Sequence, residues 1–137
     1  MLYIGVDLGT SAVKLLLMNE AGHIEKMVSR EYPLSFPHSG WSEQNPYDWY
    51  DKTLDGLKEL LSECDKSQVD GISFGGQMHG LVTLDAQDEV VRPAILWNDG
   101  RTTEETAYFN EQIGRDRLTE YTANIAFAGF TAPKILW

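Results

Sequence analysis

Apolar and polar residues alternate along the first thirty positions of the chain. From Leu2 to Asp7 every second residue is apolar, and the same period returns over residues 13–17 after a turn that contains glycine. A period of two places one face of a strand in a core. A second turn at residues 19–22 leads into a weaker alternation over residues 24–32. The pattern therefore predicts three antiparallel strands.

After residue 45 the spacing between successive apolar residues changes from two to three or four positions. Asn45 suits a helix N-cap and Pro46 suits the first helical position, so a helix is predicted to begin there and to run to about residue 61. The preceding residues, 33–45, show no period and predict an ordered loop that packs Phe36 and Trp41 onto the domain. One apolar face is expected on the helix, formed by Tyr47, Tyr50, Leu54, Leu57 and Leu61.

The sequence pattern from residue 69 onward predicts mostly short strands and one complete further helix. Strands are expected at 69–74, 81–84 and 90–97, followed by a helix at 102–113. Pro133 suits the first turn of a further helix, which we expect to be cut short by the end of the chain. Strands, helix, strands and helix in this order predict a mixed α/β fold.

Composition narrows the class of protein. The chain has 137 residues, of which 42% are hydrophobic, which predicts one domain with a real core. A formal net charge of −10 argues against a nucleic-acid partner and against an anionic membrane surface. Cys64 is the single cysteine, so an intrachain disulfide is excluded and a reducing, cytoplasmic location is expected. Neither a signal peptide nor a membrane-spanning segment is predicted.

The turn between the first two strands is a candidate phosphate site. Gly9 lets a backbone approach a phosphate, Thr10 and Ser11 offer hydroxyl donors, and Asp7 can hold the water shell of Mg²⁺. An ordinary hairpin turn explains the same residues equally well. Lys14 is expected to point to solvent, and the spacing of a Walker A motif is absent.

Two further segments could contact a polar ligand. The first, residues 75–80 (GGQMHG), places Gln77, Met78 and His79 among glycines, where donors and acceptors suit sugar hydroxyls. A bent strand with a structurally bonded histidine is the alternative.

In the second segment, residues 95–101 (ILWNDGR), Trp97 could pack on a sugar while Asn98 and Asp99 bind its hydroxyls. The alternative is that Trp97 belongs to the core, Asp99 caps a helix and Arg101 pairs with a carboxylate.

Five segments in this order resemble the FGGY carbohydrate kinases, and most closely the xylulokinase group. They are YIGVDLGTS, WSEQNPYDWY, GGQMHG, PAILWNDGR and GFTAPKILW, and they cover essentially the whole chain. The resemblance implies an actin-like, or ribonuclease H-like, ATPase fold in which two domains clasp nucleotide and substrate. Residues 1–137 would supply most of the first domain, without the C-terminal nucleotide-binding domain.

The resemblance also implies roles for residues. Asp7 resembles the metal-associated aspartate, and Gly9, Thr10 and Ser11 resemble the phosphate-facing turn that binds ATP. Met78 and His79 match the dipeptide that contacts the ketose, where glycerol kinases of the family carry Arg-Glu. Gln77, Trp97, Asn98 and Asp99 look like neighbours of that pocket.

The implied reaction is the ATP- and Mg²⁺-dependent phosphorylation of D-xylulose. The family places the catalytic base and the adenine pocket beyond residue 137, so we expect this chain alone to be inactive. It is also expected to self-associate through exposed apolar residues, namely Phe127, Phe130, Ile135, Leu136 and Trp137.

Other functions are compatible with these motifs. The rival substrates are another pentulose or a sugar acid. The rivals from other classes are an actin-like nucleotide switch and a non-catalytic scaffold, neither of which needs a pocket for a polyol.

Overall fold

The computed structural model describes residues 1–137, which form two compact units. Unit 1 comprises Met1–Pro33 and Pro46–Gln77, and unit 2 comprises Leu34–Asn45 and Met78–Trp137. The chain therefore passes between the units three times.

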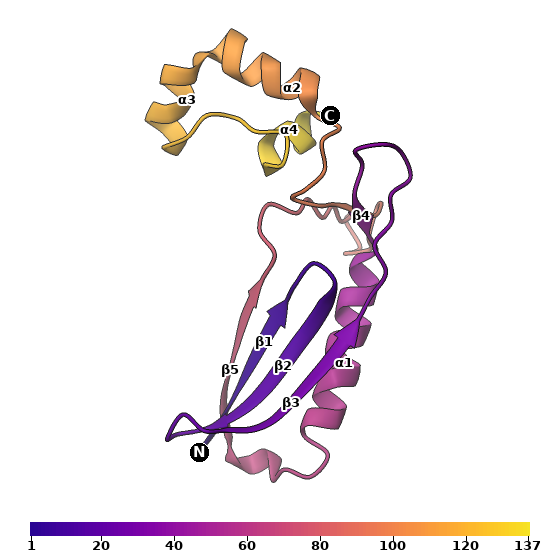
Figure 1. The fold of residues 1–137 in the computed structure, drawn as a ribbon, viewed down its shortest axis with the longest axis vertical. Coiled ribbons are helices and arrows are strands. Elements are labelled where there is room, and N and C mark those ends of the chain that lie inside the picture. The colour runs from indigo at the N-terminus through magenta and orange to yellow at the C-terminus, as the bar shows by residue number, and fades with distance from the viewer. The chain divides into compact units, whose positions relative to one another are not determined.

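Unit 1 is built on a four-stranded sheet with the strand order β3-β2-β1-β5 (Figure 1). Neighbours β1, β2 and β3 pair antiparallel, whereas β5 pairs parallel with β1. The three antiparallel opening strands that the sequence predicts are confirmed, and the parallel strand β5 makes the sheet mixed. The strands are β1 (Leu2–Leu8), β2 (Ala12–Asn19), β3 (Ile24–Glu31) and β5 (Val69–Gly76).

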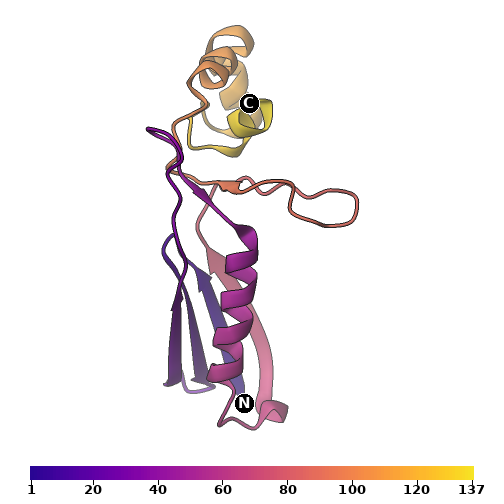
Figure 2. The same cartoon turned by 90° about the vertical axis from the view of Figure 1, so that its right-hand side faces the viewer.

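Helix α1 (Pro46–Leu60) covers one face of this sheet and contacts β2 and β3 (Figure 2). The apolar residues at alternate strand positions point to the helix and form the core, which includes Ile4, Val6, Val13, Leu15 and Leu17. A short 3-10 turn (Lys66–Gln68) then connects the end of α1 to β5. The predicted helix and hairpin pattern therefore account for the core of unit 1.

The predicted apolar face of α1 is confirmed at Leu57 and Leu61, which pack against the core, and is wrong at the three residues before them. Tyr50 is 64% exposed and Tyr47 is 43% exposed, whereas Gly56 and Leu60 are buried. A Cβ atom on Gly56 would lie 2.5 Å from Leu15 Cδ1, so the helix approaches the sheet at its one glycine. Close backbone approach at Gly56, together with the leucines near the end of the helix, sets which side of α1 is buried.

Unit 2 contains little regular sheet. Strands β4 (Glu43–Gln44) and β6 (Ala94–Ile95) pair antiparallel, and isolated bridges join Leu81 to Ile95 and Leu84 to Val90. The strands predicted at 81–84 and 90–97 are therefore wrong in extent. The Asp85 carboxylate accepts the N–H groups of the turn that follows, which takes local hydrogen bonds in place of a ladder.

Helices supply the rest of unit 2. The predicted helix at 102–113 begins as expected but continues through a π-helical turn into a second helix. The loop residue Phe36 is 64% exposed, so its predicted packing is wrong, whereas Trp41 packs within unit 2. None of the helices is both long and apolar enough to cross a membrane. The helical segments are α2 (Thr103–Tyr108), the π turn (Phe109–Gly114), α3 (Arg115–Thr122) and α4 (Thr131–Leu136).

Candidate functional site

The β1–β2 turn in unit 1 is held by backbone hydrogen bonds. The Gly9 N–H donates to the Ala12 carbonyl over 3.0 Å, which closes the turn. From the end of β3, the Tyr32 N–H donates to the Ser11 carbonyl over 3.2 Å, and the Tyr32 hydroxyl donates to the Gly9 carbonyl. The turn that carries the predicted phosphate-facing residues is therefore fixed from outside the hairpin.

Tyr32 is a site residue that the sequence did not reveal. Its side chain is 5% exposed, and burial together with the negative charge of Asp7 raises its pKa to about 12. The hydroxyl therefore stays protonated and remains a donor to Gly9 at any physiological pH. The sequence predicts residue 32 as the end of a weak strand but does not identify the turn as its partner.

Asp7 lies at the end of β1 and is exposed. It pairs in register with Lys14 on β2 and with Gly75 on β5, and all three line a groove of about 790 Å³ in unit 1. Lys14 is exposed, as the sequence predicted.

The donor set around Asp7 suits Mg²⁺ held mainly by water and substrate oxygens. No three His, Cys, Asp or Glu side chains gather into a metal-binding cluster. Mg²⁺ commonly keeps several waters and takes one or two carboxylates plus phosphate oxygens, so a single exposed carboxylate fits that kind of site. Asp7 would hold the hydrated ion, and Mg²⁺ would neutralise phosphate charge there.

The GGQMHG segment is divided between the two units. Gln77 belongs to unit 1, where its N–H donates to the Leu8 carbonyl over 2.7 Å and so continues the pairing of β5 with β1. Met78 and His79 belong to unit 2. The structure therefore groups Gln77 with the turn of Gly9, Thr10 and Ser11.

His79 in unit 2 adopts a left-handed backbone conformation, with φ of 58°. Its ring stacks on Phe130, with the two centroids 4.3 Å apart. Met78, which precedes it, is 55% exposed. Both side chains of the dipeptide are therefore presented at the surface of unit 2.

Trp97 and Asn98 are also exposed at the surface of unit 2. Trp97 is 42% exposed whereas Leu96 is fully buried, so the alternative that Trp97 is a core residue is wrong. Asn98 lines a hollow of about 380 Å³ together with Phe36 and Trp41. These side chains offer an aromatic face and an amide to a ligand.

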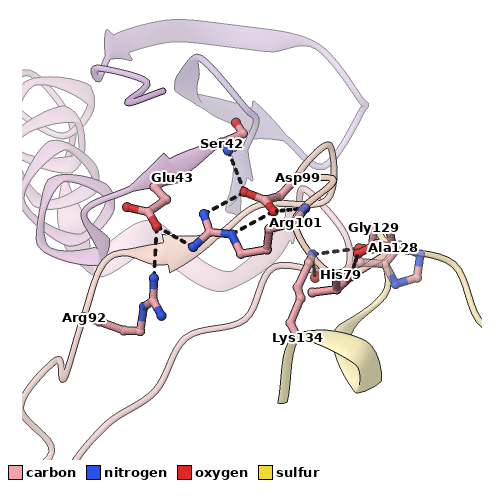
Figure 3. A network of polar contacts seen from close by, with 10 residues as sticks. Ser42, Glu43, His79, Arg92, Asp99, Arg101, Ala128, Gly129 and Lys134 are labelled. Carbon is pink, nitrogen blue, oxygen red and sulfur yellow. Dashed lines mark hydrogen bonds and ion pairs between the residues drawn. The ribbon is translucent and has the colours of Figure 1, made fainter. Parts of the chain in front are cut away.

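Asp99 is buried in unit 2, where protein groups donate hydrogen bonds to its carboxylate. Its side chain is 0% exposed and accepts hydrogen bonds from the Ser42 N–H over 2.6 Å and from the Arg101 guanidinium over 2.7 and 2.9 Å (Figure 3). Burial alone would raise the pKa of Asp99, but the hydrogen bonds from Arg101 and Ser42 outweigh it and hold the pKa below its ordinary value. This geometry favours the structural alternative, in which Arg101 pairs with a carboxylate, over direct contact of Asp99 with sugar.

The same network extends to a second carboxylate. Glu43 on β4 lies 2.8 Å from Arg101 and 3.0 Å from Arg92. The Arg101 guanidinium also lies over the Trp41 ring at 3.7 Å and the Trp137 ring at 5.0 Å. Paired charges and aromatic faces thus surround an arginine that is 1% exposed.

A loop before α4 lies against the Trp97 segment. A Cβ atom on Gly129 would lie 2.2 Å from the Trp97 carbonyl oxygen, so only glycine fits there. The loop is fixed by Thr102, whose hydroxyl donates to the Ala128 carbonyl over 2.9 Å, and by Asn110, whose amide bonds Ala126 in both directions. Sequence reasoning did not identify this loop as part of the site.

Lys134 on α4 joins that loop to the His79 segment. Its ammonium donates to the carbonyls of His79 and Gly129, each over 2.7 Å (Figure 3). The side chain is 2% exposed. Burial lowers the pKa of Lys134 to about 8, with Asp99 raising it and Arg101 lowering it further.

Comparison with known sequences shows the family to which the chain belongs. The sequence pattern of the N-terminal domain of the FGGY carbohydrate kinases matches residues 2–137. The chain belongs to the FGGY family of carbohydrate kinases. Xylulose kinase from Bacillus subtilis (strain 168) is 49% identical over 136 residues, which are 98% of this chain and 27% of that protein. The chain thus spans about a quarter of the length of this FGGY relative.

Solved structures of FGGY kinases share the fold. A xyloylose kinase from Brucella ovis is 43% identical with a TM-score of 0.92, over all of this chain and 29% of that one. A gluconate kinase from Lactobacillus acidophilus is 27% identical with a TM-score of 0.80, over 87% of this chain and 24% of that one. The predicted actin-like kinase fold is confirmed, and family membership favours a kinase over an actin-like switch or a scaffold.

Proposed function

We propose that the full-length protein phosphorylates D-xylulose to D-xylulose 5-phosphate with ATP and Mg²⁺, as a cytoplasmic enzyme. The observation that carries this proposal is the 49% identity to a xylulose kinase over 98% of the chain. The exposed Met78-His79 dipeptide in unit 2 agrees with it, because it is the pair that the resemblance assigns to ketose contact.

Roles follow from where each residue lies. In unit 1 the turn of Gly9, Thr10 and Ser11 offers N–H and hydroxyl donors to phosphate oxygens, and Asp7 holds hydrated Mg²⁺. ATP supplies the phosphoryl group, and Mg²⁺ offsets its charge. Gln77 would act beside this turn, since its backbone is bonded to Leu8. The chain's part in the reaction is to orient the phosphate and to limit its charge repulsion.

Unit 2 supplies the sugar contacts in this proposal. His79 and Asn98 would hydrogen-bond hydroxyls, while Met78 and Trp97 would pack on the carbon face of the ketose. Asp99 would contribute by fixing the segment that carries Trp97 and Asn98, because its carboxylate is occupied by protein donors.

A coupled assay of ADP formation on the full-length protein tests the proposal. We expect turnover that depends on D-xylulose, and we expect His79→Ala to raise the KM for xylulose about tenfold or more through the lost contact. The matched control is His23→Ala, because His23 is exposed in the β2–β3 turn of unit 1. Absence of xylulose-dependent turnover would contradict the assigned substrate.

A sugar acid is the second candidate substrate. The similarity to the gluconate kinase from Lactobacillus acidophilus favours including it, although that identity is 27%. The assay should therefore be run with gluconate and with other pentuloses beside xylulose. Turnover with gluconate alone would replace the substrate and leave the family assignment unchanged.

A further inference from the structure

Lys134 is a buried cation whose contacts are two backbone carbonyls. Burying an ammonium is costly unless hydrogen bonds compensate for the lost water. A structure that needed only a filled space at this position would be served as well by an apolar side chain of similar length. The role of the charge should therefore be found in the two carbonyl groups that accept hydrogen bonds from it.

One of the two carbonyls belongs to a strained residue. His79 has a φ of 58°, a conformation that non-glycine residues rarely adopt without support from their surroundings. The Lys134 ammonium donates to the His79 carbonyl over 2.7 Å, and the Thr131 hydroxyl donates to it over 3.3 Å. Hydrogen bonds from a charged donor are roughly twice as strong as those between neutral groups. The ammonium is thus the main support for this peptide.

The other carbonyl leads to the second predicted sugar segment. Gly129 accepts from Lys134 over 2.7 Å, and its Cα lies close enough to the Trp97 carbonyl that a Cβ would clash. The next residue, Phe130, stacks on the His79 ring. One ammonium therefore ties the peptide of His79 to the loop that supports both the His79 ring and the Trp97 segment.

We propose that Lys134 is a positioning residue of the sugar site. Its ammonium holds the His79 carbonyl in place and so sets the direction in which Met78 and His79 meet the sugar. Its bond to Gly129 keeps the Trp97 segment in register with them. This proposal rests on the proposed function only in taking these residues as sugar contacts. At neutral pH the charge is retained, since burial lowers the pKa of Lys134 only to about 8.

Steady-state kinetics of the full-length kinase and its Lys134→Met variant test the proposal. Methionine keeps much of the length of the side chain and removes the charge and the donors. We expect the KM for the sugar to rise about tenfold or more while the KM for ATP stays within about twofold of the parent. Lys134→Arg keeps the charge, so it should recover part of the loss. Lys58→Met is the matched control, because Lys58 is exposed on α1 in unit 1 and should change neither constant.

A purely structural role predicts a different result. If Lys134→Met is folded and its KM for the sugar equals that of the parent, or if both KM values and kcat worsen together, the proposal is overturned. Should Lys134→Met fail to fold, Thr131→Val decides, because it removes the weaker donor to the same carbonyl. A rise of about twofold to threefold in the KM for the sugar supports the proposal, and an unchanged KM overturns it.

Failure of the proposed function would be visible separately. If the parent enzyme turns over another sugar in the substrate panel, the same variants are measured with that sugar. The difference between the effects on the KM for the sugar and on the KM for ATP then still tests the role of Lys134. Only the choice of xylulose as the substrate is rejected.

Discussion

The two regions that carry the candidate site are held by different forces. In unit 1 the turn that we propose to face phosphate is fixed by backbone hydrogen bonds and by one neutral hydroxyl, that of Tyr32. In unit 2 the segments that we propose to contact sugar are fixed by buried charges, namely Asp99, Glu43, Arg101 and Lys134. Neutral bonds contribute little each but cost little to bury, whereas buried charges are strongly destabilising when one partner is removed. Unit 2 should therefore be the more sensitive to single substitutions.

The largest effect is expected at Asp99. Asp99→Ala leaves the Arg101 guanidinium, 1% exposed, with only Glu43 as a charged partner, and we expect a loss of about 3 kcal/mol in unfolding free energy. Urea unfolding of the full-length protein measures it. Arg92→Gln is the control, since Arg92 is 34% exposed and its ion pair should be worth less than about 1 kcal/mol. Both residues lie in unit 2, so equal losses in the two variants would show that burial of a charge does not determine the cost of removing its partner.

The next effect is expected at Gly129. In Gly129→Ala the new methyl would lie 2.2 Å from the Trp97 carbonyl oxygen, so one of the two backbones must move. We expect the KM for the sugar to rise about tenfold, with the KM for ATP unchanged, because the displaced segment carries Trp97. Gly71→Ala on β5 is the control, since its nearest neighbour, the Tyr3 ring, would lie at an ordinary 3.7 Å. A change in the KM for ATP alone would contradict the division of roles.

The smallest effect is expected at Tyr32. Tyr32→Phe removes the hydroxyl that donates to Gly9, and a neutral bond is worth about 1 kcal/mol, so the KM for ATP should rise about fivefold. Kinetics at fixed saturating sugar measure this change, and the KM for the sugar should not move. A variant with parental KM for ATP would show that the backbone bonds alone hold the turn.

The same residue predicts a dependence on alkaline pH. The pKa of Tyr32 is raised to about 12 in the folded protein, above the ordinary value of 10.0, so folding favours its protonated form. The stability it contributes is full below pH 10 and is lost as the pH rises towards 12. Unfolding free energies across that range should fall less steeply in Tyr32→Phe than in the parent.

The sequence predicts unit 1 better than unit 2, for a physical reason. The hairpins and α1 follow from the local period of apolar residues, and turn-forming residues mark where these elements end. The predicted face of α1 was right at Leu57 and Leu61 but missed Gly56, because hydrophobic spacing does not encode a close backbone approach. In unit 2 the expected strands near residues 81–97 shrink to isolated bridges and the two-residue strand β6, since side chains such as Asp85 take the backbone N–H groups.

The residues of the candidate site also differ in how well the sequence predicts them. Exposed candidates such as Met78, Trp97 and Asn98 could be named from residue type and glycine-rich context. The pairing of Arg101 with a carboxylate was among the alternatives, but the role of Lys134 could not be predicted, because a lysine is expected at the surface until its tertiary partners are known. Tyr32 was predicted only as the end of a weak strand, and its hydroxyl partner lies in the turn between two other strands.

The strand order of unit 1 has a consequence for how the chain folds during synthesis. β1, β2 and β3 are joined by short turns and can pair as they leave the ribosome, whereas the parallel partner of β1 follows only after α1. One edge of β1 must therefore stay open until β5 has been made. An open strand edge can pair with the wrong chain, so the interval set by α1 is the period in which a nascent chain is most exposed to misassembly.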